Sequence, residues 1–305
     1  MFMRNWDSAT NHDILGNPDL LDEICPQEKD YQDALKVAEQ LDIPLHRIDF
    51  IEEYWNTVFS YFINEYKKGR TPNPDMMCNK YIKFNAFLKE AEALGADYIA
   101  MGHYAQVRHE QEKSYLLRGV DENKDQTYFL CMLSQKQLRK AIFPIGHLLK
   151  SDVRKIALTA KLYTAEKKDS TGICFIGERN FKEFLKNYLP AQPGNMVTPS
   201  GEIIGKHDGL MYYTIGQRKG LGIGGSNAYG SEAWFVCGKD LEKNELIVGQ
   251  GHDSLYLESN WCIAKDLNWI TDKPLEHHPY TAKFRYRQKD IPVEIEYIDS
   301  TTIKV

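Results

Sequence analysis

Apolar residues in the first half of the chain recur at helical spacing in some stretches and alternate in others. Positions three and four residues apart predict helices near residues 30–41 and 54–66. Between these two helices, alternating apolar residues predict a strand over 43–50. Helices and strands that follow one another in this order are typical of a parallel α/β sheet.

A second strand leads directly into a glycine and a histidine. The helical pattern that follows Cys78 ends near Gly95, and residues 96–101 then predict a strand that runs into Gly102 and His103. Ligands of parallel α/β sheets bind beyond the carboxyl ends of the strands, so Gly102 would admit a ligand and His103 could hydrogen-bond to it. The alternative is an ordinary glycine turn beside a packed histidine.

The segment Arg70–Lys80 places two prolines, an asparagine and an aspartate immediately before Cys78. Asp75 is predicted to be the N-cap of a helix, which puts Cys78 in the first helical turn. The positive end of the helix dipole favours a thiolate there, and the thiolate is the form of cysteine that attacks an electrophile. The alternative is a stiff loop before a buried structural cysteine.

Two further loops contain candidate functional residues. Residues 121–126 form a charged loop that could present Lys124 and Gln126 to phosphates or base edges, or could simply face water. A pair of lysines at 167–168 precedes Cys174, and cations near a cysteine favour its thiolate form. That interpretation requires the loop to fold both lysines toward Cys174, whereas lysine pairs usually face solvent.

The pattern changes in the second half of the chain. Short β segments and frequent glycines begin near residue 180, and a second β-rich region begins near residue 250. We therefore expect an α/β domain over 1–178, a small central β-rich domain over 179–248 and a C-terminal β-barrel domain over 249–305. The glycines of segment 210–225 lack the order of a phosphate loop and are interpreted as turns.

The segment Lys283–Gln288 is predicted to be a strand whose three basic residues share one face. Side chains alternate along a strand, so Arg285 and Arg287 would point the same way and be interleaved with Phe284 and Tyr286. Basic and aromatic residues together suit a nucleic-acid backbone with stacked bases. An ordinary solvated face of a barrel is the alternative.

Composition narrows the class of protein. Hydrophobic residues make up 42% and charged residues 27% of the 305 residues, which is typical of globular proteins. No apolar run approaches the roughly 18 residues that span a bilayer, and a signal-peptide pattern is absent, so a cytoplasmic protein without a membrane partner is expected. The six cysteines form no C-x-x-C pair and show no zinc spacing, so neither a disulfide framework nor a metal site is expected. The net charge of −5 means that nucleic-acid binding would depend on local basic patches.

Taken together, these stretches resemble the bacterial tRNA-specific 2-thiouridylases, which install sulfur at position 2 of the wobble uridine. The resemblance covers essentially the whole chain, and the joint order of its motifs is highly specific. It implies a parallel α/β domain like that of the adenine-nucleotide hydrolases (ATP pyrophosphatases), followed by two small β-rich domains. The motifs are Phe2–Asp7, Gly69–Asp75, Cys78–Lys80, Gly102–Tyr104, Lys124–Gln126, Asp169–Gly177, Leu189–Gly194, Gly216–Gly225 and Phe284–Gln288.

The resemblance also implies roles for individual residues. Cys78 would be the nucleophile, Cys174 would carry a persulfide, and Asp75 is a candidate acid–base group. The nucleotide and tRNA sites would take a larger set: Met3 and Gly102 for adenosine, Asn73, Pro74 and Asp75 for the target uridine, and His103, Lys124, Asp125, Gln126, Arg285 and Tyr286 for tRNA. No residue is implied as a metal ligand.

The reaction of this family has two stages. ATP, with Mg²⁺, adenylates O2 of the uridine, and persulfide sulfur from Cys174 then displaces AMP. The sulfur is delivered either directly or as hydrosulfide that Cys78 releases by forming a transient disulfide with Cys174. The implied partners are the tRNAs for Glu, Gln and Lys and, as sulfur donor, a sulfur-relay protein or a cysteine desulfurase.

Two departures from the family pattern shape the expectations. Members begin with a strand and a Ser-Gly-Gly-x-Asp-Ser loop that binds pyrophosphate, and they end with further barrel strands; these 305 residues contain neither segment. We therefore expect that the 305-residue chain alone does not adenylate uridine and that an uncovered sheet edge lowers its solubility. A catalytically inactive tRNA-binding remnant is thus an alternative. A third hypothesis is a thiol-redox protein that uses Cys78 and Cys174, which no C-x-x-C pair supports.

Overall fold

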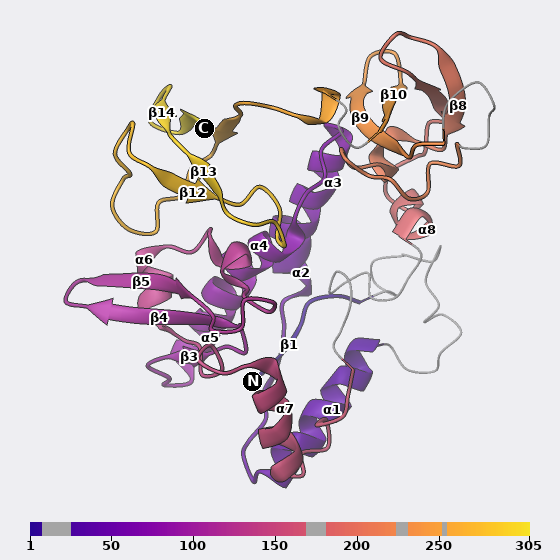
Figure 1. The fold of residues 1–305 in the computed structure, drawn as a ribbon. Coiled ribbons are helices and arrows are strands. Elements are labelled where there is room, and N and C mark those ends of the chain that lie inside the picture. Colours follow the sequence, from indigo (N-terminus) through magenta and orange to yellow (C-terminus); the bar gives the residue numbers. More distant parts are fainter. Residues whose placement is uncertain (8–25, 169–180, 224–230, 252–254) are drawn as a thin grey trace.

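The structure is a computed structural model that describes residues 1–7, 26–168, 181–223, 231–251 and 255–305. A first region of helices and parallel strands is followed by two regions built mainly from β-strands (Figure 1). The predicted fold class, an α/β part with parallel strands before two β-rich parts, is confirmed. None of the helices in the described ranges combines the length and the apolar character that a bilayer span needs.

The chain begins with a strand–helix–strand unit. Strand β1 (Phe2–Arg4) pairs in parallel with β2 (Arg47–Asp49), and helix α1 (Pro26–Gln40) lies between them in the sequence. The helix matches the predicted one closely. The strand is shorter than the predicted 43–50, because only its last residues meet a partner strand.

A second parallel pair follows. Strand β3 (Ile99–Ala100) pairs with β6 (Ala141–Ile142), and the backbone of Met101 adds a hydrogen bond to Ile142 at the end of the pair. The predicted strand 96–101 is therefore present only in its second half. Gly102 and His103 follow its carboxyl end, as expected.

Two long helices cross the middle of the first region, and both contain a π-helical segment. Their parts are α2 (Ile51–Tyr54), η2 (Trp55–Phe59) and α3 (Ser60–Lys67) in one, and α4 (Pro74–Met77), η3 (Cys78–Ala86) and α5 (Phe87–Ala93) in the other. Buried aromatic rings pack along the first helix, with Phe59 4.9 Å from Trp6 and 6.0 Å from Phe62 between ring centroids. The helices agree with the predicted patterns, whereas the π segments were not predicted.

An antiparallel hairpin that the hydrophobic pattern did not reveal follows β3. Strands β4 (Ala105–Glu110) and β5 (Lys113–Arg118) pair along their whole length. The turn residues are Gln111 and Glu112, and Gln111 has φ +49°. Hairpin turns usually place Gly, Asn or Asp at such positions, so this turn carries no sequence signal. The remaining elements of this region are η4 (Thr127–Leu130), α6 (Gln135–Arg139) and α7 (Lys150–Thr159).

Gly146 lies where the chain crosses the start of β4, and replacing it with Ala is expected to destabilise the protein strongly. A Cβ at Gly146 would lie 1.6 Å from the backbone oxygen of Ala105, and the backbone of Gly146 is itself held by Val120. Relief of this clash requires a backbone shift, so we expect the free energy of unfolding to fall by at least about 3 kcal/mol. Urea denaturation measures the loss. Gly102→Ala is the control, because its Cβ would meet nothing within 4 Å, and equal losses in the two variants would contradict the prediction.

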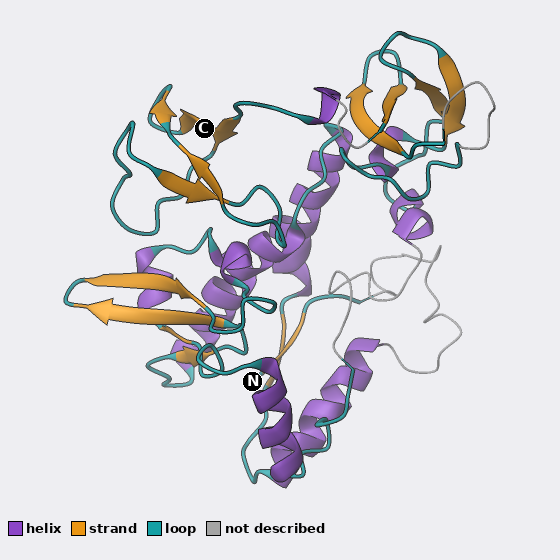
Figure 2. Ribbon diagram, in the orientation of Figure 1, coloured by secondary structure: helices purple, strands orange, loops and turns teal. Residues whose placement is uncertain are grey.

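The middle region is a four-stranded sheet in the order β8-β7-β10-β9. Figure 2 shows its strands in orange at the upper right. Its central strands β7 and β10 are parallel, and the other neighbours are antiparallel. Met196, Val236, Leu246 and Val248 form its buried side. The elements are α8 (Phe181–Lys186), β7 (Gly194–Val197), β8 (Ile203–His207), η5 (Leu210–Tyr212), β9 (Trp234–Asp240) and β10 (Glu245–Gln250).

The strands that the structure describes in the C-terminal region are all short. Three of them form a sheet in the order β11-β15-β14, and β12 pairs with β13. The elements are η6 (Leu255–Leu257), β11 (Ile263–Lys265), β12 (Tyr280–Ala282), β13 (Ile291–Val293), β14 (Glu296–Tyr297) and β15 (Thr302–Lys304).

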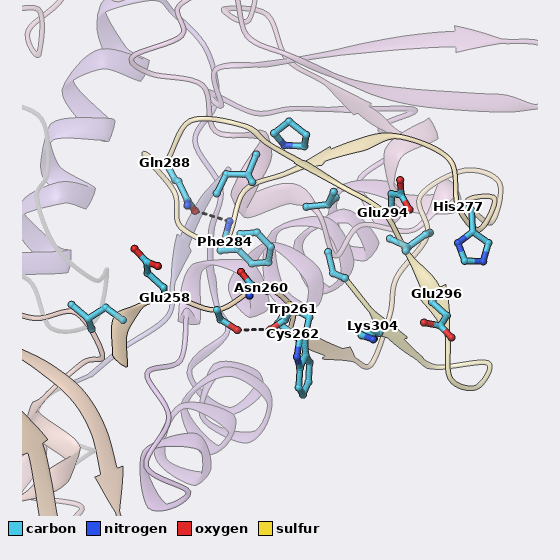
Figure 3. A pocket seen from close by; sticks show the side chains of 17 residues that line it. Glu258, Asn260, Trp261, Cys262, His277, Phe284, Gln288, Glu294, Glu296 and Lys304 are labelled. Carbon is cyan, nitrogen blue, oxygen red and sulfur yellow. Dashed lines mark hydrogen bonds between the residues drawn. The ribbon is translucent and has the colours of Figure 1, made fainter. Parts of the chain in front are cut away.

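The predicted basic strand Lys283–Gln288 is wrong. This segment is a turn in which the side-chain oxygen of Gln288 accepts hydrogen bonds from the backbone N–H group of Phe284 at 3.0 Å (Figure 3) and from that of Arg285 at 3.2 Å. The glutamine side chain thereby replaces the partner strand that these donors would otherwise need. The three basic side chains consequently do not share the face of a strand.

Candidate functional site

The helix that carries Cys78 begins at Asn73. The side chain of Asn73 accepts a hydrogen bond from the backbone N–H of Asp75 at 3.1 Å, and Pro74 occupies the first helical position. The prediction that Asp75 is the N-cap is therefore wrong, because the cap lies two residues earlier. Cys78 follows the first turn and opens the π segment η3. The effect of the helix dipole is largely confined to the first turn, so its influence on Cys78 is weaker than expected.

Asp75 and Cys78 differ in their exposure. Cys78 is only 2% exposed, whereas Asp75 is half-buried. Burial raises the pKa of the Asp75 carboxyl, and the ammonium group of Lys83 opposes this change. A carboxyl group whose pKa is moved toward neutrality is better suited to exchange a proton at physiological pH. The environment of Asp75 therefore fits the acid–base role implied for it.

His103 is packed in the core at the end of β3. It is 8% exposed, and its ring lies 5.9 Å from Phe84 and 6.0 Å from Phe143 between centroids. Burial, assisted by the charge of Lys83, lowers the pKa of His103 to about 3. The imidazole is thus neutral at physiological pH. A contact with tRNA, which stays a prediction, would be a hydrogen bond and not an ion pair.

The segment Asp125–Leu130 connects the Cys78 helix with the end of β3. The side chain of Asn79 donates to the backbone oxygen of Phe129 at 2.8 Å, and the side chain of Gln126 accepts from the backbone N–H of Tyr104 at 3.0 Å. Asp125 is buried and accepts from the backbone of Gly119 at 2.9 Å. Asp125 and Gln126 therefore hold the loop together from within.

The C-terminal region reaches this site through Tyr286. Its ring centroid lies 4.4 Å from Phe129 and 6.1 Å from Tyr128. Arg285, the neighbouring residue in the sequence, extends elsewhere and donates to the backbone oxygen of Ile215 in the middle region. The structure thus brings the ring of Tyr286 beside the 125–130 segment, while the guanidinium group of Arg285 is bound to the middle region and its charge still reaches Tyr128.

The residues implied for adenosine lie in different strand pairs. Met3 is partly buried on β1, and exposed Gly102 follows β3 with open space where a side chain would be. Just beyond the same strand ends, buried Asn5 Oδ1 and His103 Nδ1 have no hydrogen-bond partner among the described residues. Polar atoms of this kind at the carboxyl ends of parallel strands fit a polar ligand such as a nucleotide.

Other candidate features lie outside this site. Cys174, the predicted persulfide carrier, is outside the described residues. The described residues contain no cluster of three or more His, Cys, Asp or Glu side chains that could hold a metal ion. A cavity of about 930 Å³ in the C-terminal region is lined by Glu258, Glu294 and Glu296 but by only one lysine, Lys304 (Figure 3). This charge balance disfavours the binding of phosphate groups.

Sequence reasoning missed Lys83. It lies five residues after Cys78 in η3, and the wide turns of a π-helix bring residues at this spacing to the same side. Its charge reaches both Asp75 and His103. The hydrophobic pattern carries no sign of a π segment, and at ordinary α-helical spacing residues five apart lie on different sides of the helix.

Three family models match the chain in succession. They are described as the tRNA methyl transferase HUP domain at residues 1–178, the tRNA methyl transferase PRC-barrel domain at 182–250 and the aminomethyltransferase β-barrel domain at 259–305. The first model alone covers more than half of the chain.

Curated relatives match the chain over its full length. The tRNA-specific 2-thiouridylase MnmA of Acholeplasma laidlawii is 60% identical over 305 residues, which are 100% of this chain and 80% of the relative. The proteins of the same name from Lacticaseibacillus paracasei and Alkaliphilus oremlandii are each 58% identical over 100% of this chain, and the matches cover 78% and 81% of those relatives. Identity at this level over the whole chain shows common descent and a common fold. The chain therefore belongs to the family of tRNA-specific 2-thiouridylases, enzymes that transfer sulfur to tRNA.

Proposed function

We propose that the chain performs ATP-dependent 2-thiolation of the wobble uridine, position 34, of tRNA. The observation that supports this most is the order of groups on one helix: Asn73 caps it, Asp75 lies in its first turn with a raised pKa, and Cys78 follows. The names of the relatives support the choice of tRNA and of position 2. In this proposal Asn73, Pro74 and Asp75 bind the uridine, and Met3 and Gly102 bind the adenosine of ATP.

The chemistry requires the O2 atom of uridine to leave. ATP supplies an adenylyl group that converts this oxygen into a good leaving group. In this proposal Asp75, whose pKa is raised by burial, exchanges the proton that the uridine ring loses when O2 reacts and regains when sulfur replaces it. His103 stays neutral, so it orients tRNA without placing a second cation beside Lys83.

Sulfur transfer then involves both cysteines. The terminal sulfur of a Cys174 persulfide attacks C2 of the uridine, and AMP departs with the former O2. The thiolate of Cys78 attacks Sγ of Cys174, which breaks the S–S bond to the transferred sulfur and forms a Cys78–Cys174 disulfide. A dithiol reductant must then reduce this disulfide before the next turnover.

The remaining features of the proposal follow from the same reaction. Mg²⁺ accompanies ATP, the substrates are the tRNAs for Glu, Gln and Lys, and a sulfur-relay protein or a cysteine desulfurase in the cytoplasm loads Cys174. In this proposal His103, Lys124, Asp125, Gln126, Arg285 and Tyr286 are the residues of the chain that meet tRNA. The three matched segments support a division into domains at 1–178, 179–248 and 249–305.

Deletion of the gene is expected to remove 2-thiouridine from the tRNA of the cells that carry it. Mass spectrometry of tRNA hydrolysates measures the nucleoside, and return of the gene should restore it. A protein that only binds tRNA would leave the 2-thiouridine content unchanged on deletion. Such a result would overturn the proposed function and favour the non-catalytic alternative.

A further inference from the structure

The short segment between helices α3 and α4 is held by the middle region. The backbone oxygen of Gly69 accepts a hydrogen bond from Nζ of Lys239 at 2.9 Å. Lys239 lies on β9, and the C-terminal end of α3 points toward this part of the middle region (Figure 1). Two residues further along, Oγ1 of Thr71 lies 3.0 Å from Oγ1 of Thr214.

Lys239 is in an unusual environment for a lysine. Its side chain is partly buried, and this burial lowers its pKa to about 8. The ammonium group pairs with no carboxylate among the described residues, and the backbone oxygen of Gly69 is the acceptor that the structure provides. Burial of an ammonium group is unfavourable unless it is hydrogen-bonded, so the contact with Gly69 is needed for this conformation.

Packing fixes the same point of the loop. Gly69 has φ +71°, and a Cβ at this position would lie 2.8 Å from the side chain of Leu241. On the other side of the segment, the guanidinium group of Arg70 pairs with Glu65 at 3.1 Å, and its backbone N–H donates to the Glu65 backbone at 3.0 Å. Residues 69–71 are therefore held from both sides, directly before the helix cap Asn73.

The partner residues in the middle region are themselves held in place. The backbone N–H of Thr214 donates to the side chain of Gln217 at 3.0 Å, and the N–H of Gly216 donates to the backbone of Val236 at 2.7 Å. Val236 and Lys239 belong to the same strand, β9. One turn and one strand of the sheet thus present Thr214 and Lys239 to the loop as a single unit.

We propose that Lys239 and Thr214 are positioning residues that set the conformation of the loop leading into Asn73, Pro74 and Asp75 at the start of α4. The middle region would thereby determine how these residues face their substrate, although it contributes no reacting group. The consequence for uridine rests on the proposed function, whereas the positioning itself does not.

Hydrogen–deuterium exchange of the purified 305-residue chain tests the positioning without ATP or tRNA. Lys239→Met and Thr214→Val are each expected to speed exchange of the backbone amides in residues 70–78 by roughly tenfold, because each removes one hydrogen bond of the loop. Lys243→Met is the matched control, since Lys243 is exposed in the same region and its ammonium group forms a long ion pair of 3.9 Å with Asp240. Lys239→Arg retains a charged donor and should restore slow exchange.

The outcomes are distinct. Unchanged exchange of residues 70–78 in both Lys239→Met and Thr214→Val would overturn the proposal, and so would equal acceleration in helix α5, which indicates general destabilisation. Cellular 2-thiouridine separates this proposal from the proposed function: Lys239→Met should lower it roughly tenfold, and Lys243→Met should not. If exchange changes but 2-thiouridine does not, the positioning is confirmed, and the assignment of this loop to uridine binding is wrong.

Discussion

Replacing Cys78 with Ser in the chromosomal gene is expected to abolish 2-thiouridine in the tRNA of the cells. A serine hydroxyl is not ionised at neutral pH and cannot attack Sγ of Cys174 to release the transferred sulfur, so we expect the 2-thiouridine content to fall by at least roughly 10³-fold. Serine is close to cysteine in size, so we expect the fold to be retained, with a modest loss of stability because a more polar hydroxyl is buried at a position that is only 2% exposed. Mass spectrometry of tRNA hydrolysates measures the product.

The control for Cys78→Ser is Cys237→Ser. Cys237 is a partly buried cysteine on β9 whose thiol contacts the backbone oxygen of Phe235 at 3.5 Å, a contact that a hydroxyl can also make. This variant should retain normal 2-thiouridine. Retention of the nucleoside in Cys78→Ser, with its thermal melting curve unchanged, would show that sulfur transfer does not require Cys78.

His103 is expected to make the stability of the protein depend on pH between 6.5 and about 3. Below pH 6.5 the unfolded chain binds a proton at this histidine, whereas the folded chain does not until the pH approaches 3. The stabilising effect of the buried neutral ring is therefore complete above pH 6.5 and is lost as the pH falls, by about 1.4 kcal/mol per pH unit. The side chain is buried between Phe84 and Phe143, so solvent screening is small.

Urea denaturation at pH 7.5 and pH 5 tests this prediction. From pH 7.5 to pH 5, the free energy of unfolding of the wild-type chain should fall by roughly 2 kcal/mol more than that of His103→Gln, because glutamine cannot be protonated. Exposed His277 provides the control, and His277→Gln should show the wild-type dependence. Parallel curves for the wild type and His103→Gln would contradict the buried neutral state of the imidazole.

Local patterns in the sequence predicted the elements that depend on local forces. The helix at 30–41 corresponds to α1 because its apolar residues recur at helical spacing over several turns. The hairpin β4–β5 escaped prediction because its turn, Gln111-Glu112, contains no residue that favours positive φ. The helix cap was placed at Asp75 although Pro74 favours the first helical position, which makes Asn73 the cap.

In the candidate site, too, features set by neighbouring residues were predicted, whereas contacts between residues far apart in the sequence were not. The segment 70–80 and the His103 strand end were singled out from their own residue types, and both lie at helix or strand ends as expected. The contacts of Phe129 with Asn79 and Tyr286 were not foreseen, since they join residues far apart in the sequence. The basic strand at 283–288 failed for a related reason, because the side chain of Gln288 takes up the backbone donors locally.

The parallel pairing of β7 with β10 has a consequence for synthesis on the ribosome. Strand β7 can pair with β8 as soon as both have left the exit tunnel, but its other neighbour, β10, is made about fifty residues later. Until then one edge of β7 stays open, and the buried side chain of Met196 lacks its neighbour Leu246. Closure of the sheet also completes strand β9, which carries Lys239. The order of translation therefore makes residues 69–71, which contact Lys239 and Thr214, one of the last parts of the α/β region to reach its final conformation.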